Sequence, residues 1–208
     1  MNEDDTYTFK GTDFTFNDID GHTFSGVQII AEETDGTLIY NGTDVSIGQI
    51  CTNVALLTFT PTPNENNDNQ APYATFQFKV RDSSGDVSDA DYTYTINVNP
   101  INDNPTSADA SVSTDEGVTY TFKTTDFPFS DVDGHLFNGI RIRSLVSKGN
   151  LKYDGNPVSI NLYVDDVTKL IYSPLPNQNG TPYTSFDFQV RDSQDAYSLS
   201  NYEMSINV

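Results

Sequence analysis

The stretch Tyr7-Thr-Phe-Lys-Gly-Thr-Asp-Phe-Thr-Phe-Asn-Asp-Ile-Asp-Gly-His22 recurs with few changes as Tyr120-Thr-Phe-Lys-Thr-Thr-Asp-Phe-Pro-Phe-Ser-Asp-Val-Asp-Gly-His135. The correspondence continues to the end of each copy, where Ile96-Asn-Val98 matches Ile206-Asn-Val208. Self-similarity over so long a period indicates repeated structural units. The sequence therefore predicts two copies of one domain, covering residues 1–101 and 102–208.

Within each copy, apolar and polar residues alternate in short runs. Examples in the first copy are Tyr7/Phe9, Val27/Ile29, Leu57/Phe59, Phe76/Phe78/Val80 and Tyr92/Tyr94/Ile96/Val98. This period of two is typical of half-buried strands, and we expect the aromatic stripes to be core. Asn41-Gly42 and Asp154-Gly155 fit two-residue hairpin turns. The predicted fold is all-β, with two tandem Greek-key β-sandwich domains of the cadherin/immunoglobulin-like kind.

The two copies differ at their beginnings. Thr106–Asp115 is the predicted first strand of the second copy, and the first copy has no equivalent segment. We therefore expect the first strand of the first copy to be truncated and the chain to be a fragment of a longer array.

Charge and composition exclude several classes of protein. The net charge is −20, with 30 acids against 10 bases, which argues against binding to nucleic acids or anionic membranes. No apolar run is long enough to span a bilayer. The single cysteine, Cys51, permits no intrachain disulfide and fits a small buried apolar role. Bound divalent cations would relieve the repulsion between acids, although solubility alone also accounts for them.

The segment Asn99-Pro-Ile-Asn-Asp-Asn-Pro105 joins the two copies. Its prolines stiffen it. In a seven-stranded sandwich this segment reaches the end of the second domain where Asp131, Asp133 and Asp192 are expected. Glu3 is expected at the end of the first domain where the chain leaves it, facing the joint from the other side. Carboxylate and amide oxygens in this number suit calcium. Asp-x-Asp-Gly and Asn/Asp/Pro-rich segments are also ordinary turn sequences, so a plain linker is the alternative.

A family resemblance bears on this choice. Asn102-Asp-Asn-Pro105 is similar to the joint motif of cadherins, and Asp131-Val-Asp133 resembles their paired-acid loop. The order and spacing of Tyr120-Thr-Phe122, Leu170-Ile-Tyr-Ser-Pro174 and Phe186–Asp192 resemble the cadherin-like tandem repeats of large bacterial extracellular adhesins of the RTX and biofilm types.

The resemblance implies secreted or cell-surface repeats that act as calcium-rigidified spacers supporting adhesion or biofilm formation. The implied partners are calcium and neighbouring repeats. The alternative is a module that binds a glycan or another copy of the chain in a calcium-dependent manner. The implied calcium ligands at the joint are Glu3, Asn102, Asp103, Asn104, Asp131, Asp133 and Asp192; Asp18, Asp20 and Asp82 form the equivalent set in the first copy, and Glu116 would face a further domain.

One departure concerns His22 and His135, which stand where such repeats often carry another acid. The substitution either removes a ligand or changes only a surface loop. These histidines are duplicated with the scaffold, so no catalytic triad is argued from them. The zinc-binding clusters and phosphate-binding loops of enzymes are also absent from the sequence. We expect no enzymatic activity, no binding of nucleic acid and no insertion into a membrane.

Overall fold

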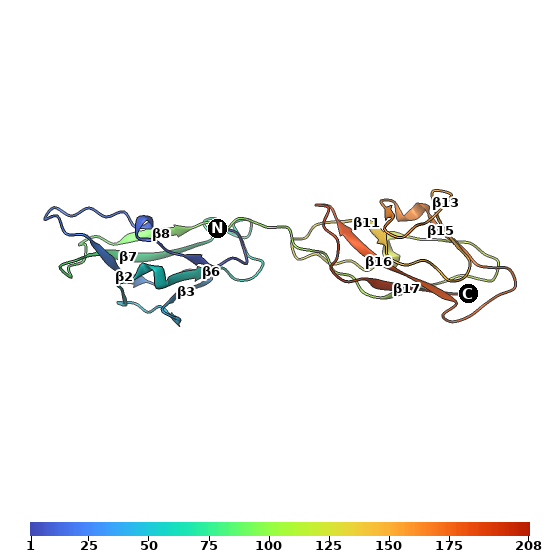
Figure 1. The fold of residues 1–208 in the computed structure, drawn as a ribbon, viewed down its shortest axis with the longest axis horizontal. Helices are drawn as coiled ribbons and strands as arrows, with labels where there is room; N and C mark the ends of the chain where they lie inside the picture. Colours follow the sequence, from blue (N-terminus) through green and yellow to red (C-terminus); the bar gives the residue numbers. More distant parts are fainter. The chain divides into compact units, whose positions relative to one another are not determined.

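The computed structural model describes all residues from Met1 to Val208. The chain divides into two compact units, Met1–Ile101 (unit 1) and Asn102–Val208 (unit 2), which are described separately. Figure 1 shows strands as the dominant element of both units. The helical segments are four single turns of 3-10 helix, too short to cross a membrane.

Unit 2 is a sandwich of two sheets (Figure 1). The five-stranded sheet has the order β14 (Tyr163–Val164), β11 (Phe137–Ile142), β16 (Thr184–Asp192), β17 (Tyr202–Asn207) and β9 (Ala110–Ser113). The four-stranded sheet has the order β10 (Tyr120–Thr121), β15 (Leu170–Ser173), β12 (Asn150–Tyr153) and β13 (Asn156–Pro157). The helical turns are η3 (Thr124–Asp126) and η4 (Val167–Lys169).

Unit 1 repeats this architecture with one strand fewer. One sheet has the order β5 (Ile50–Cys51), β2 (Phe24–Ala31), β7 (Ala74–Asp82) and β8 (Tyr92–Ile96). The other has the order β1 (Tyr7–Thr8), β6 (Leu57–Thr60), β3 (Thr37–Tyr40) and β4 (Thr43–Asp44). The helical turns are η1 (Gly11–Asp13) and η2 (Val54–Leu56). The predicted all-β sandwich fold is confirmed.

The cores follow the alternation of the sequence. Along β16, the inward positions Phe186, Phe188 and Val190 are all fully buried. Phe186 meets Phe122 from the opposite layer edge to face, with ring centroids 5.7 Å apart. Each such buried ring contributes roughly 1.5–3 kcal/mol of hydrophobic free energy, so the paired stripes hold the two sheets together.

Both predicted hairpins are present. Asn41 and Gly42 connect β3 to β4 with φ of 51° and 83°, and Asp154 and Gly155 connect β12 to β13 with φ of 48° and 79°. Two consecutive positive φ angles define the type I′ turn, whose twist matches that of the paired strands.

The two units differ in whether a first strand is present. In unit 2, β9 pairs in parallel with β17, and it lies within the predicted segment Thr106–Asp115. In unit 1, β8 is an edge strand. The expectation that every aromatic stripe is core is wrong for Tyr92, which is 46% exposed. Alternation identifies the face of a strand, but it does not reveal whether a neighbour covers the edge.

Candidate metal centre

Asp131 and Asp192 are built into loops at the same end of unit 2. Oδ1 of Asp131 accepts hydrogen bonds from the backbone N–H groups of Asp133 (3.1 Å) and His135 (3.0 Å). Oδ1 of Asp192 likewise accepts from Gln194 (2.9 Å) and Ala196 (2.8 Å). Each carboxylate therefore uses one oxygen to fold its own loop, which leaves the other oxygen for a different partner.

Three consecutive residues at the start of unit 2 contact these loops. Nδ2 of Asn102 donates to Oδ2 of Asp192 over 3.0 Å, and the backbone N–H of Asp103 donates to Oδ2 of Asp133 over 2.8 Å. Nδ2 of Asn104 donates to the carbonyl oxygen of Tyr197 over 2.8 Å. The structure thus brings Asn102, Asp103 and Asn104 together with Asp131, Asp133 and Asp192.

His135 lies inside this cluster. Its Nδ1 is 3.6 Å from Oδ1 of Asp131 and 3.8 Å from Oδ2 of Asp133. One ligand atom from each of Asp131, His135 and Asp192 can be chosen so that all three lie within 4.8 Å of one another. The imidazole therefore faces the acids, and the substitution by histidine is not confined to the loop surface.

Burial strengthens the electrostatic repulsion between the carboxylates of the cluster. The Asp131 side chain is only 1% exposed, and its Oδ2 has no hydrogen-bond partner. Asp192 is fully buried. Two carboxylates 4 Å apart repel by about 1 kcal/mol in bulk water and by about 4 kcal/mol at an effective dielectric constant of 20. A buried, unpaired carboxylate oxygen facing further acids is a suitable position for a cation.

The equivalent loops of unit 1 have a different set of contacts. Oδ1 of Asp18 accepts from the backbone of Asp20 (2.9 Å) and His22 (2.9 Å), as its counterpart does in unit 2. However, Oδ2 of Asp82 lies 2.9 Å from Nδ1 of His22. In unit 2 the corresponding oxygen, Oδ2 of Asp192, accepts a hydrogen bond from Asn102 instead. The carboxylate of Asp20 is exposed and makes no hydrogen bond.

Hydrogen bonds also explain the acidity of Asp82. The hydroxyl group of Ser84, followed by the backbone N–H groups of Asp86 and Gly85, lowers the pKa of Asp82 to about 2. These donors stabilise the charged carboxylate. One ligand atom from each of Asp18, His22 and Asp82 can be chosen so that all three lie within 4.8 Å of one another, and Asp20 does not belong to this group.

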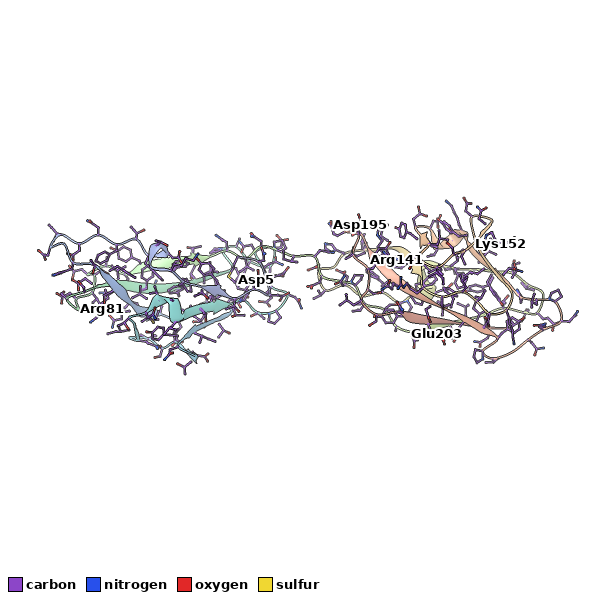
Figure 2. The ribbon with its side chains drawn as sticks, viewed as in Figure 1. Asp5, Arg81, Arg141, Lys152, Asp195 and Glu203 are labelled. Atoms are coloured by element: carbon purple, nitrogen blue, oxygen red, sulfur yellow. The ribbon has the colours of Figure 1, made fainter.

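Glu3 lies at the other end of unit 1. Figure 2 labels Arg81, next to Asp82, and Asp5, close to Glu3 in sequence, at opposite ends of this unit. Glu3 is 2% exposed, and its carboxylate accepts from Nδ2 of Asn66 over 2.9 Å and from the backbone N–H of Ile101. Its role as a ligand shared with unit 2 stays a prediction. Its counterpart in unit 2, Glu116, is exposed and forms no hydrogen bond.

Sequence reasoning did not identify Asn66 as a partner of Glu3. Asn66 belongs to the asparagine-rich run Asn64–Asn69, which precedes β7. Asn66 itself is 6% exposed. Buried polar groups require partners. The available signal was the position of this run, which precedes the predicted strand at Phe76 and is therefore expected at the end of the domain where Glu3 also lies.

Residues 102–204 match the family model described as "Bacterial Ig domain". No curated protein sequence matches the chain significantly. Solved structures with a similar arrangement include EC1-2 of human mucin-like protocadherin (13% identity, TM-score 0.35, covering 87% of this chain and 84% of that one). EC1-4 of Drosophila N-cadherin follows at 10% identity and TM-score 0.42, covering 92% and 47%.

A further similar structure is that of domains 4 and 5 of the S-layer protein SbsC, at 11% identity and TM-score 0.28, covering 89% of this chain and 99% of that one. Bacterial Ig-like domains are typically extracellular modules. The strand order and the sequence match agree on the fold: the chain is a tandem pair of β-sandwich repeats, of which the second matches the bacterial Ig domain.

Proposed function

We propose that this chain is a calcium-rigidified spacer segment of an extracellular bacterial adhesin. The observation that carries the proposal is the contact between the linker and the acid loops. Asn102 and Asp103 bond to Asp192 and Asp133, beside the buried and unpaired Oδ2 of Asp131. A cation held by these groups would fix the linker on unit 2.

The donor set fits calcium. Four carboxylates (Asp103, Asp131, Asp133 and Asp192) carry enough oxygens for the six to eight that calcium requires. The amides of Asn102 and Asn104, which donate through Nδ2 in this structure, would add oxygens if they turned over on binding. His135 is the exception, because imidazole is a poor ligand for a hard cation. Calcium would supply positive charge to the acids and an ordered anchor for the linker.

Ordering such a linker has an entropic cost that a bound ion would offset. Ordering each linker residue costs about 1–2 kcal/mol of conformational entropy, and the hydrogen bonds of Asn102 and Asp103 compete with water. Extracellular calcium modules bind with dissociation constants of about 10⁻⁴–10⁻³ M. Binding at that strength would order the linker in a calcium-rich exterior and release it when calcium is removed.

Calorimetric titration of calcium into the full chain tests the binding step. Asp103→Ala is expected to weaken calcium binding about tenfold or more, because it removes a charged oxygen from the centre. Asp154→Ala is the matched control, since Asp154 serves the hairpin between β12 and β13. Equal effects of the two substitutions would show that the linker is not a ligand.

Small-angle scattering tests the rigidity. With calcium, the distribution of dimensions should narrow, and a chelator should broaden it again. A distribution that does not respond to calcium would reject the spacer mechanism even if calcium binds. The alternative, in which the chain binds a glycan or another copy, stays a prediction that glycan arrays and sedimentation with and without calcium would test.

A further inference from the structure

The imidazole ring of His135 faces carboxylates without forming a hydrogen bond to them. Its Nδ1 is buried and has no hydrogen-bond partner. Oδ1 of Asp131 lies 3.6 Å from this nitrogen, and Oδ2 of Asp133 lies 3.8 Å from it. Both distances exceed the range of about 2.7–3.2 Å that is typical of an N–H···O hydrogen bond. The nitrogen is therefore separated from both acids by a gap.

The equivalent histidine of unit 1 shows how such a ring pairs with an acid. Nδ1 of His22 lies 2.9 Å from Oδ2 of Asp82, which is within hydrogen-bond distance. The same residue type in the repeated loop thus forms the bond in unit 1, whereas His135 does not form it in unit 2. Because a buried polar atom without a partner is unfavourable, a polar or charged partner is expected in the gap beside His135.

A second buried atom without a partner belongs to the same group. The side chain of Asp131 is 1% exposed, and its Oδ2 accepts no hydrogen bond. Asp192, from the loop that follows β16, is fully buried, and the three residues offer ligand atoms within 4.8 Å of one another. Asp195, which Figure 2 labels, lies in that loop. One oxygen and one nitrogen are therefore both available to a single ion.

The two acids are held in place by their own loops. Oδ1 of Asp131 and Oδ1 of Asp192 each accept two backbone N–H groups. Hydrogen bonds of this kind orient the ligands of a metal before it binds. The His135 side chain is 26% exposed, so an ion can reach the ring from solvent. The group is thus preorganised and accessible.

The nitrogen determines which class of ion fits. Imidazole suits zinc and the neighbouring transition-metal ions, whereas calcium and magnesium take oxygen ligands. Zinc binds histidine nitrogen and carboxylate oxygen at about 2.0–2.2 Å, so two ligands in a tetrahedral arrangement lie about 3.3–3.6 Å apart. The separation of 3.6 Å between Nδ1 of His135 and the Asp131 carboxylate is of this size. One divalent ion would also balance the charge of the two carboxylates.

We propose that Asp131, His135 and Asp192 form a binding site for a divalent transition-metal ion of the zinc type. Nδ1 of His135 and one oxygen from each acid are the ligands, and water fills the remaining position. The site shares its acids with the proposed calcium centre, so the two ions compete for them. Binding of the transition metal does not itself depend on the proposed function.

A water molecule in the gap is the competing explanation. It would bond to Nδ1 of His135 and to the carboxylate of Asp131 without any metal. Both explanations satisfy the buried atoms, but only the metal site requires a nitrogen ligand. Experiments that detect a bond between the metal and the ring therefore distinguish them.

Titration of zinc chloride and of cobalt chloride into the full chain, in buffer without calcium, tests the proposal. We expect saturable micromolar binding, with cobalt giving the visible absorption band of a tetrahedral site. Zinc should shift the NMR signal of Nδ1 of His135, and magnesium should leave it unchanged. Binding only at millimolar zinc, or zinc binding that leaves this signal unchanged, would overturn the proposal in favour of water in the gap.

Two glutamine substitutions provide a matched pair of variants. His135→Gln removes the nitrogen ligand, and affinity for zinc should fall at least about tenfold. His22→Gln makes the same change in unit 1, where the ring already pairs with Asp82, and the high-affinity binding should remain. Equal losses in the two variants, or a larger loss in His22→Gln, would overturn the assignment to unit 2.

Asp131→Asn protects the test against misfolding of the first variant. The asparagine oxygen can still accept the two N–H groups of the loop, while the atom in place of Oδ2 no longer binds a cation. Affinity for zinc should again fall at least about tenfold, with the melting temperature in chelator measured alongside. A folded Asp131→Asn variant that binds zinc as tightly as the original chain would overturn the proposal.

Calcium titrations of the same variants separate this inference from the proposed function. His135→Gln should weaken zinc binding without weakening calcium binding, because glutamine offers an oxygen. Asp103→Ala should do the reverse. Zinc binding through His135 in a chain that binds no calcium would support this inference and reject the calcium centre. Calcium binding in a chain that binds no zinc would reject this inference and leave the calcium centre standing.

Discussion

The hydroxyl group of Tyr120 donates a hydrogen bond to Oδ2 of Asp126 over 2.9 Å, and the same oxygen accepts from the backbone N–H of Lys123 over 2.8 Å. The contact links β10 to the turn η3. Unit 1 repeats it between Tyr7 and Asp13 over 2.8 Å. Because the same pair forms at matching positions of both units, it is a local element of the repeat itself.

Tyr120→Phe removes the donor and leaves the ring in place. A hydrogen bond to a charged acceptor contributes about 1.5–3 kcal/mol when buried, and this one is only partly buried. We therefore expect the free energy of unfolding of unit 2 to fall by about 1–2 kcal/mol, measured by urea denaturation. Tyr92→Phe is the control in unit 1, where Tyr92 is 46% exposed and makes no hydrogen bond. An equal loss in the free energy of unfolding of unit 1 would contradict the assignment.

The same pairs predict how stability depends on alkaline pH. Burial and then Asp126 raise the pKa of Tyr120 to about 12, and the hydrogen bond to Asp13 does the same for Tyr7. In the unfolded chain both ionise near the ordinary value of 10.0. Their contribution to stability is therefore complete below pH 10 and is lost as the pH rises toward 12. Tyrosinate absorbance follows this titration, and ionisation of all tyrosines near 10 would contradict it.

Substitutions at two glycines of unit 2 can separate the effect of a steric clash from that of backbone strain. Gly139 has φ of +99°, and a Cβ added there would lie 2.3 Å from the carbonyl oxygen of Val164. Gly155 has φ of +79°, with nothing within 4 Å of an added Cβ. Gly155→Ala should cost about 1–2 kcal/mol for the left-handed backbone alone, and Gly139→Ala should cost more because β14 must also move. Thermal unfolding compares them, and equal losses would contradict the clash.

Cys51 provides a probe of unit 1. Its side chain is fully buried between the sheets, and burial raises the pKa of its thiol to about 11. Only the thiolate reacts readily with disulfide reagents. We expect no labelling of the native chain at mildly alkaline pH and complete labelling in denaturant. Rapid labelling of the native chain would show that unit 1 opens locally at β5.

The fold was predictable because each signal was local and repeated. The alternation Phe186, Phe188, Val190 marks one face of a strand, and Asp154-Gly155 marks a turn. The exposure of Tyr92 was not predictable, because it depends on whether another strand covers β8. Period-two patterns carry information about faces, whereas the coverage of an edge is a property of the whole sheet.

The sequence predicted which acids lie at the same end of unit 2, but it did not predict their hydrogen bonds. Strand order was enough to place Asp131 and Asp192 at one end of unit 2. Asp20 and Asp133 occupy equivalent loop positions, yet only Asp133 accepts a bond, from the backbone of Asp103. The difference in unit 2 comes from the segment Asn102 to Asn104, which contacts its loops. Equivalent residues in a repeat therefore acquire different roles from their neighbours.

The last prediction concerns His135, whose Nδ1 faces Asp131 and Asp133. His135→Asp replaces a nitrogen with carboxylate oxygens, which calcium prefers. Under the calcium proposal, affinity for calcium should rise about tenfold, while affinity for nitrogen-preferring ions such as zinc should fall. Without calcium, the added charge should lower the melting temperature of unit 2, because it increases repulsion among buried acids.

His22→Asp makes the matched change in unit 1, where no linker segment supplies oxygens to Asp18 and Asp82. Its effect on calcium affinity should be smaller, because that centre lacks the ligands equivalent to Asn102, Asp103 and Asn104. Calorimetry of the two variants separates these cases. Unchanged calcium affinity in His135→Asp, together with unchanged stability in chelator, would mean that position 135 lies outside the ion's coordination sphere, and that the acids at this end of unit 2 serve the loops alone.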